Sequence, residues 1–62
     1  LFRSGEWLKL ISQVQRKMRK GKPLISIAEE LEEEEQVIGP IYVLVKAHPE
    51  FTREAVYGQL EI

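Results

Sequence analysis

The chain has 62 residues, which is enough for one domain only, and a domain of this size buries about 60% of the surface that its unfolded chain exposes. No Cys is present, which excludes disulfides and thiolate metal sites, and no apolar run approaches the ~18 residues that a membrane-spanning helix needs. The net charge of −1 conceals two opposite halves: residues 1–25 hold seven Lys or Arg against one Glu, a net charge of +6, whereas residues 26–62 hold two against nine Glu, a net charge of −7.

The first expected helix covers residues 6–20. Apolar residues recur along it at i, i+4, i+7 and i+11, the spacing of one helix face: Trp7, Ile11, Val14 and Met18. Cations fill its last turn, where they complement the helix dipole. Gly21 is expected to follow as the residue after the C-cap, and Pro23 prevents the helix from continuing.

A second helix is expected to begin at Ser26. Ser26 and Glu29 have the spacing of a capping box, in which each side chain accepts a hydrogen bond from the main-chain amide of the other residue. Ile27, Ala28 and Leu31 form its inward face. The helix should end within the acidic run of residues 32–35, whose adjacent carboxylates repel one another and which lacks the spacing of a calcium loop.

A third helix is expected over residues 35–47, closed by His48 and Pro49. Its inward line consists of Ile38, Ile41 and Val45. Pro40 leaves two alternatives open, because a proline inside a helix removes a hydrogen bond and kinks the backbone. Either the helix begins near Gly39, or its first turn is irregular.

A short fourth helix is expected over residues 53–60, with Thr52 as its N-cap and with Phe51 and Val56 at the spacing of a hydrophobic staple. The elements together predict an all-α fold, a small domain of three to four helices with a helix-turn-helix-like centre. The expected core lies on the inward faces: Trp7, Ile11, Val14, Met18, Ile27, Ala28, Leu31, Ile38, Ile41, Val45, Phe51, Val56 and Leu60.

The charges argue against DNA recognition by the expected third helix. Glu34 and Glu35 lie at its N-terminal end, which in a helix-turn-helix protein enters the major groove, and there they would repel phosphates. Among its outward residues only Gln36 and Lys46 are of a type that reads bases or phosphates. The pattern therefore predicts the fold of this motif without its usual function.

Catalysis by this segment is not expected. The sequence has one His, no Cys and no Asp; no Ser has a plausible His and acid partner, because only one His is available, and the glycines form no phosphate loop. We interpret His48 as a capping or surface residue. No cofactor and no metal are expected.

Five cations in seven residues support an alternative, which is sequence-indifferent nucleic-acid binding: Arg16, Lys17, Arg19, Lys20 and Lys22. The simpler interpretation is that they complement the helix dipole and compensate the acidic half of the chain within the fold, and we favour it. No aromatic residue lies among them to stack on bases. Binding to a membrane surface is not expected, because the apolar face of the first helix is explained by the core.

Residues 7–51 resemble the C-terminal helical segment of the PD-(D/E)XK nuclease-family transposases of gut Firmicutes. The similarity rests on four successive features: the basic helix KLISQVQRKMRK, then GKP, then the helix IAEELE, then an acidic turn leading to VIGPIY. In that family a nuclease-like domain precedes such a segment. The resemblance implies that this chain is an accessory domain, and no catalytic residue carries over because nothing here matches the PD…(D/E)xK motif.

We therefore expect residues 1–62 to be a single helical domain, an excised C-terminal or accessory piece of a longer cytoplasmic protein, since the chain lacks an initiator Met. Its expected function is protein–protein or interdomain contact, with a neighbouring domain or a second copy. The residues expected to make this contact are apolar and remain after the core is filled: Leu10, Tyr42, Val43 and Tyr57.

Overall fold

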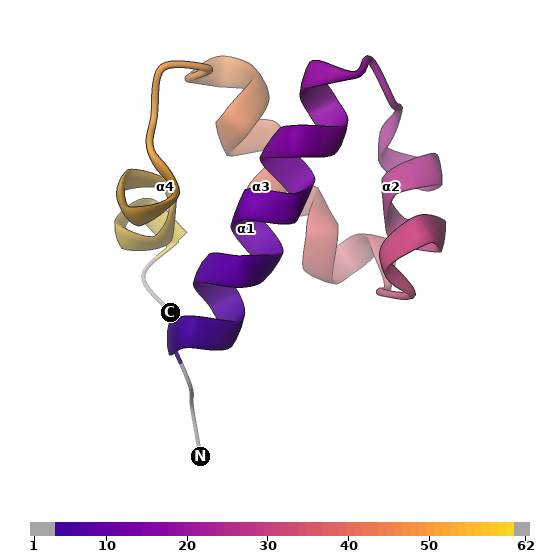
Figure 1. The fold of residues 1–62 in the computed structure, drawn as a ribbon, viewed down its shortest axis with the longest axis horizontal. Coiled ribbons are helices and arrows are strands. Elements are labelled where there is room, and N and C mark those ends of the chain that lie inside the picture. The colour runs from indigo at the N-terminus through magenta and orange to yellow at the C-terminus, as the bar shows by residue number, and fades with distance from the viewer. Residues whose placement is uncertain (1–3, 61–62) are drawn as a thin grey trace.

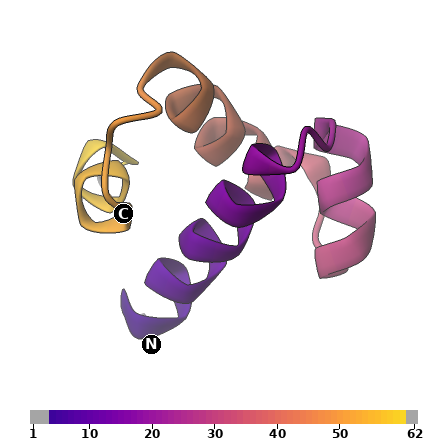
Figure 2. The ribbon, with the colours of Figure 1, turned by 45° about the horizontal axis from the view of Figure 1, so that its top comes forward.

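A computed structural model describes residues 4–60, which form four helices and contain no strand. The helices are α1 (Ser4–Arg19), α2 (Leu24–Leu31), α3 (Glu35–Ala47) and α4 (Arg53–Leu60). α1 crosses the middle of the domain, with α2 on one side, α4 on the other and α3 behind (Figures 1 and 2). α1 contacts all three other helices. The predicted all-α fold is confirmed.

The core forms where the inward faces of the four helices meet. Its buried members come from every helix: Ile11, Val14, Ile27, Ala28, Ile38, Ile41, Val45 and Val56. The other five predicted core residues are partly buried and pack against this cluster: Trp7, Met18, Leu31, Phe51 and Leu60. The helical periodicity of the sequence therefore identified the core correctly.

The turn between α1 and α2 closes on Gly21 as predicted. Gly21 has a φ of +80°, and its amide donates a hydrogen bond of 2.9 Å to the carbonyl of Met18. The next amide, of Lys22, reaches back to the carbonyl of Lys17 at 3.3 Å. These two bonds are those of a Schellman motif, in which glycine supplies the left-handed residue at no steric cost.

The predicted capping box at the start of α2 is wrong. The helix begins at Leu24, so Ser26 lies within its first turn, and the N-cap is Pro23 with φ −76° and ψ 166°. The carbonyl of Pro23 accepts the first helical hydrogen bond, of 3.0 Å, from the amide of Ile27. Because the helix begins two residues earlier than predicted, Leu24 packs against the core. The free energy gained by burying Leu24 cannot be read from the capping residues alone.

α2 ends in a second Schellman motif, but with glutamate in place of glycine. Glu32 has a φ of +57°. Its amide donates a hydrogen bond of 3.2 Å to the carbonyl of Glu29, and the amide of Glu33 donates one of 2.9 Å to the carbonyl of Ala28. Three residues, 32–34, then lead into α3, which packs on α2. This short connection gives the centre its predicted helix-turn-helix-like form.

α3 has the predicted bounds, and Pro40 lies inside it, so the alternative of a helix beginning near Gly39 is wrong. At its start the carbonyl of Glu34 accepts from the amides of both Val37, at 2.9 Å, and Ile38, at 3.1 Å. Pro40 is exposed, and Gly39 before it has no Cβ for the proline ring to meet. His48 is the C-cap, as predicted, and donates from its amide to the carbonyl of Leu44 at 2.9 Å.

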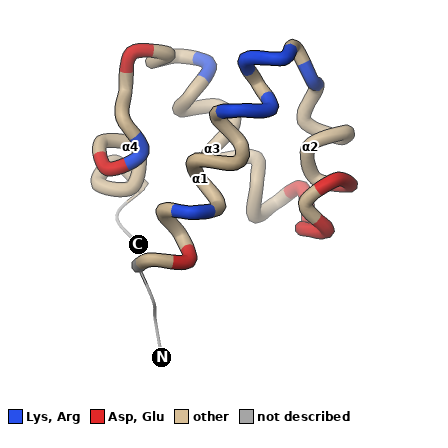
Figure 3. The backbone as a smooth tube through the Cα atoms, viewed as in Figure 1, with Lys and Arg blue, Asp and Glu red and all other residues tan. Residues whose placement is uncertain are grey.

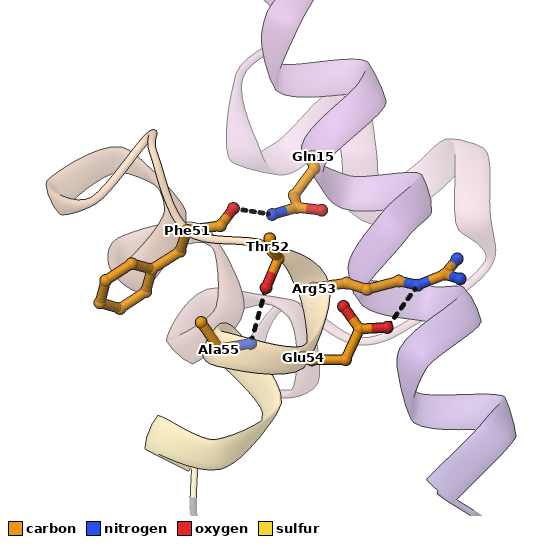
Figure 4. A network of polar contacts seen from close by, with 6 residues as sticks. All are labelled: Gln15, Phe51, Thr52, Arg53, Glu54 and Ala55. Carbon is orange, nitrogen blue, oxygen red and sulfur yellow. Dashed lines mark hydrogen bonds and ion pairs between the residues drawn. The ribbon is translucent and has the colours of Figure 1, made fainter.

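α4 also has the predicted bounds and cap. The amide of Ala55 donates a hydrogen bond of 3.2 Å to the hydroxyl of Thr52, which confirms the N-cap (Figure 4). Phe51 is partly buried and Val56 fully buried in the same cluster, as a hydrophobic staple requires. None of the helices described is long and apolar enough to cross a membrane.

Candidate interaction surfaces

Of the four apolar residues predicted to remain outside the core, only Val43 is clearly exposed, with 65% of its surface accessible. Leu10, Tyr42 and Tyr57 are half-buried and pack against the core, so the expectation that the core leaves them over is wrong. For Leu10 and Tyr42 the reason is that α1 and α3 each contact three helices, so that their buried faces are wider than a single stripe. On the outer face of α3 the ammonium of Lys46 lies 5.9 Å from the Tyr42 ring centroid, beside Val43.

Ile25 is a second exposed apolar residue, with 56% of its surface accessible, and the sequence did not indicate it. The predicted start of α2 at Ser26 placed Ile25 before the helix. Once the helix begins at Leu24, burial of Ile27 and Ala28 turns Ile25 outward.

Two of the five clustered cations pair with one carboxylate. The ammonium of Lys17 lies 2.6 Å from Oε1 of Glu30, and that of Lys22 lies 2.9 Å from Oε2. Hydrogen bonding from Lys17, and then from Lys22, lowers the pKa of Glu30 below its usual value of 4.5. The internal charge compensation favoured by the sequence therefore occurs through Glu30.

The other three cations of the cluster are exposed: Arg16, Arg19 and Lys20. Within residues 4–60 none of them forms an ion pair. Two cations outside the predicted cluster lie beside Arg16, because Lys9, Arg16 and Arg53 line one hollow between α1 and α4. Lys9 is seven residues before Arg16, so helical periodicity alone places the two on the same face of α1. Arg53 comes from α4, and nothing in the neighbouring sequence indicates that it approaches Arg16.

We call the exposed cations at and just beyond the end of α1 the basic face: Arg16, Arg19 and Lys20. Arg53 also contacts Glu54, with 3.3 Å between its Nε and Oε2 (Figure 4). The pKa of Glu54 is lowered, first by a hydrogen bond from its own main-chain amide and then by Arg53.

Residues 32–35, which we call the acidic turn, are all exposed. The only side-chain hydrogen bond that they make within the described chain joins Oε1 of Glu34 to Nε2 of Gln36 at 3.0 Å, and none of them forms an ion pair there. The turn lies at the opposite end of α2 from Lys22 (Figure 3). Within the described residues the carboxylate that pairs with the cluster at the end of α1 is Glu30, and no carboxylate of the acidic turn does so.

A hollow of about 440 Å³ lies between the first half of α1 and the start of α3. Trp7, Leu10 and Val37 supply its apolar lining, and Lys9 and Glu33 are among its charged lining residues. The exposed part of Leu10 faces this hollow, which places one predicted contact residue in a setting suited to an apolar side chain of a partner.

His48 is an exposed C-cap, as predicted. Its ring stacks on Phe51 with 4.4 Å between centroids, and Nδ1 lies 3.4 Å from Oε2 of Glu50. Within residues 4–60 no group of three or more His, Cys, Asp or Glu side chains is placed to hold a metal ion.

Comparison of the chain with protein-family models, curated proteins and solved structures finds no significant match.

Proposed function

We propose that this chain is a non-catalytic helical accessory domain that makes protein–protein or interdomain contacts. The observation that carries the proposal is the exposure of Val43 on the outer face of α3, beside half-buried Tyr42. An exposed apolar residue next to an aromatic one is a typical centre for a contact between proteins. The resemblance of residues 7–51 to transposase segments makes a nuclease- or transposase-like protein the expected parent, and its location in the cytoplasm stays a prediction.

Self-association is the form of this contact that can be tested with the purified chain and no other protein. Sedimentation equilibrium over micromolar to millimolar concentrations should show a mass above that of the monomer, and Val43→Ser should weaken the association without changing the helical circular dichroism signal. Ile25→Ser is the matched control, because it makes the same kind of change at an exposed residue of α2. Equal association of wild type and Val43→Ser would show that the outer face of α3 is not the contact.

A second candidate function is sequence-indifferent nucleic-acid binding. Three cations of the predicted cluster are unpaired within residues 4–60, and Lys9 and Arg53 line one hollow with Arg16. Fluorescence anisotropy of a labelled random duplex should then show affinity that falls steeply between ~20 mM and ~150 mM salt. Arg16→Gln with Lys20→Gln should abolish most of it, whereas Lys46→Gln on α3 should not.

A further inference from the structure

The charges left unpaired by folding form two clusters of opposite sign on one small domain. The basic face contains Arg16, Arg19 and Lys20, which are exposed and unpaired within residues 4–60. The acidic turn contains Glu32 and Glu35, which are equally exposed and unpaired there. In the backbone view the blue segments at the end of α1 lie near the start of α2, and the red segments of the acidic turn follow its end (Figure 3).

Helix dipoles do not account for this arrangement by themselves. The end of α1 and the start of α3 each carry about half an elementary charge of the sign that suits the adjacent cluster. Half a charge cannot neutralise the three unpaired cations at and just beyond the end of α1 or the four carboxylates of the acidic turn. Each cluster therefore keeps a net charge that is available to a partner outside the domain.

We propose that a second copy of this chain is that partner, and that the acidic turn of one copy docks against the basic face of the other. The charges are complementary, and every copy carries both clusters, so a two-fold pair of copies makes the same contact twice. Exposed ion pairs are individually weak, which makes this doubling important. The contact lies on a different surface from Val43, so the charge variants and Val43→Ser distinguish it from the proposed contact on α3.

The basic face and the acidic turn would each be necessary for this association. Arg16→Gln with Lys20→Gln removes two cations that line a common hollow beside Lys17 and Glu30. Glu32→Gln with Glu35→Gln removes two carboxylates and preserves side-chain size, so the left-handed residue at position 32 still has a side chain of the same length. Lys46→Gln, which changes one charge outside both clusters, is the control. Circular dichroism checks that all variants are folded.

Sedimentation equilibrium of the wild type at ~20 mM salt should show a mass that approaches twice that of the monomer, and salt of ~500 mM should return the chain to a monomer. Each double variant alone should dissociate with a constant raised about tenfold, which corresponds to 1.4 kcal/mol. An equimolar mixture of the two double variants should recover part of the association, because the intact acidic turn of one variant meets the intact basic face of the other.

Three results would overturn the inference. One is a wild type that stays monomeric at low salt. Another is a mixture of double variants that associates no better than either variant alone. The third is association that salt leaves unchanged and that only Val43→Ser weakens, which would assign self-association to the outer face of α3 instead. If the low-salt monomer binds a labelled random duplex through Arg16 and Lys20, the basic face is a surface for phosphate and the second copy is excluded as its partner.

Discussion

The side-chain amide of Gln15 in α1 donates a hydrogen bond of 3.0 Å to the main-chain carbonyl of Phe51, which lies 36 residues further along the chain (Figure 4). The bond is partly buried and holds the connection between α3 and α4 against α1. A main-chain carbonyl removed from water needs such a partner, because leaving it unpaired costs free energy.

Gln15→Ala should therefore lower the free energy of unfolding by about 1 kcal/mol, since it leaves the carbonyl of Phe51 without its donor. Urea unfolding followed by circular dichroism measures the change. Gln13→Ala is the matched control, because Gln13 is also half-buried on α1 and makes no hydrogen bond from its side chain within residues 4–60. Equal effects of the two substitutions would contradict a role for the bond to Phe51.

Thr52→Ala should destabilise the domain by about 1 kcal/mol, because it removes the hydroxyl that accepts from the amide of Ala55 at the start of α4. Thr52→Ser keeps this hydroxyl and should retain most of the stability. The same unfolding measurement applies. If the serine variant were as unstable as the alanine variant, the methyl group of Thr52 rather than its cap would be responsible.

Glu32→Gly should stabilise the domain by about 1 kcal/mol, because a left-handed backbone conformation is costly for a residue that has a Cβ. The Schellman hydrogen bonds to Ala28 and Glu29 would be kept. Glu32→Ala is the informative control, since it removes the same charge and leaves the Cβ in place. If Glu32→Ala raised the thermal midpoint of unfolding as much as Glu32→Gly, charge repulsion rather than backbone conformation would limit the stability at this position.

The pH dependence of stability should depend on Glu30. Because Lys17 and Lys22 lower its pKa in the folded state, the stabilisation is fully present above the unfolded pKa of about 4.5 and is lost as pH falls through the folded value. Wild type should therefore be more stable than Glu30→Gln at neutral pH, and the difference should disappear in acid. Urea midpoints at about pH 7 and pH 3 measure this change.

Glu29→Gln serves as the control for the Glu30 experiment. Glu29 is the adjacent exposed carboxylate, and within residues 4–60 it has no ion pair. Its substitution should leave the stability at neutral pH nearly unchanged. A loss at Glu29 as large as that at Glu30 would mean that general repulsion or attraction among charges, not the two contacts to Glu30, sets the stability.

Local signals in the sequence were sufficient for most of the fold. The bounds of α3 and α4, the closing Gly21 and the Thr52 cap all follow from interactions within a few residues. The start of α2 was predicted wrongly because the pull of Leu24 toward the core is a long-range effect. It competes with a local cap at Ser26, and the packing of the core decides the outcome.

The candidate surfaces were less predictable, because they depend on which helices become neighbours. The pairing of Lys17 and Lys22 with Glu30 needs the turn angle between α1 and α2, which the sequence does not contain. The approach of Arg53 to Arg16 needs the packing of α4 on α1. Leu10 is half-buried because the buried face of α1 is wider than a single stripe, and this width depends on how many helices pack on α1.

The packing of α4 against α1 also determines when this domain can fold. These are the first and last of the described helices, and the buried Val56 on α4 completes the same cluster as Ile11 and Val14 on α1. Contacts between such distant segments must wait for the intervening chain. During synthesis, therefore, the part of α1 that α4 covers stays exposed until the ribosome has released residues 53–60, and until then it is available to chaperones.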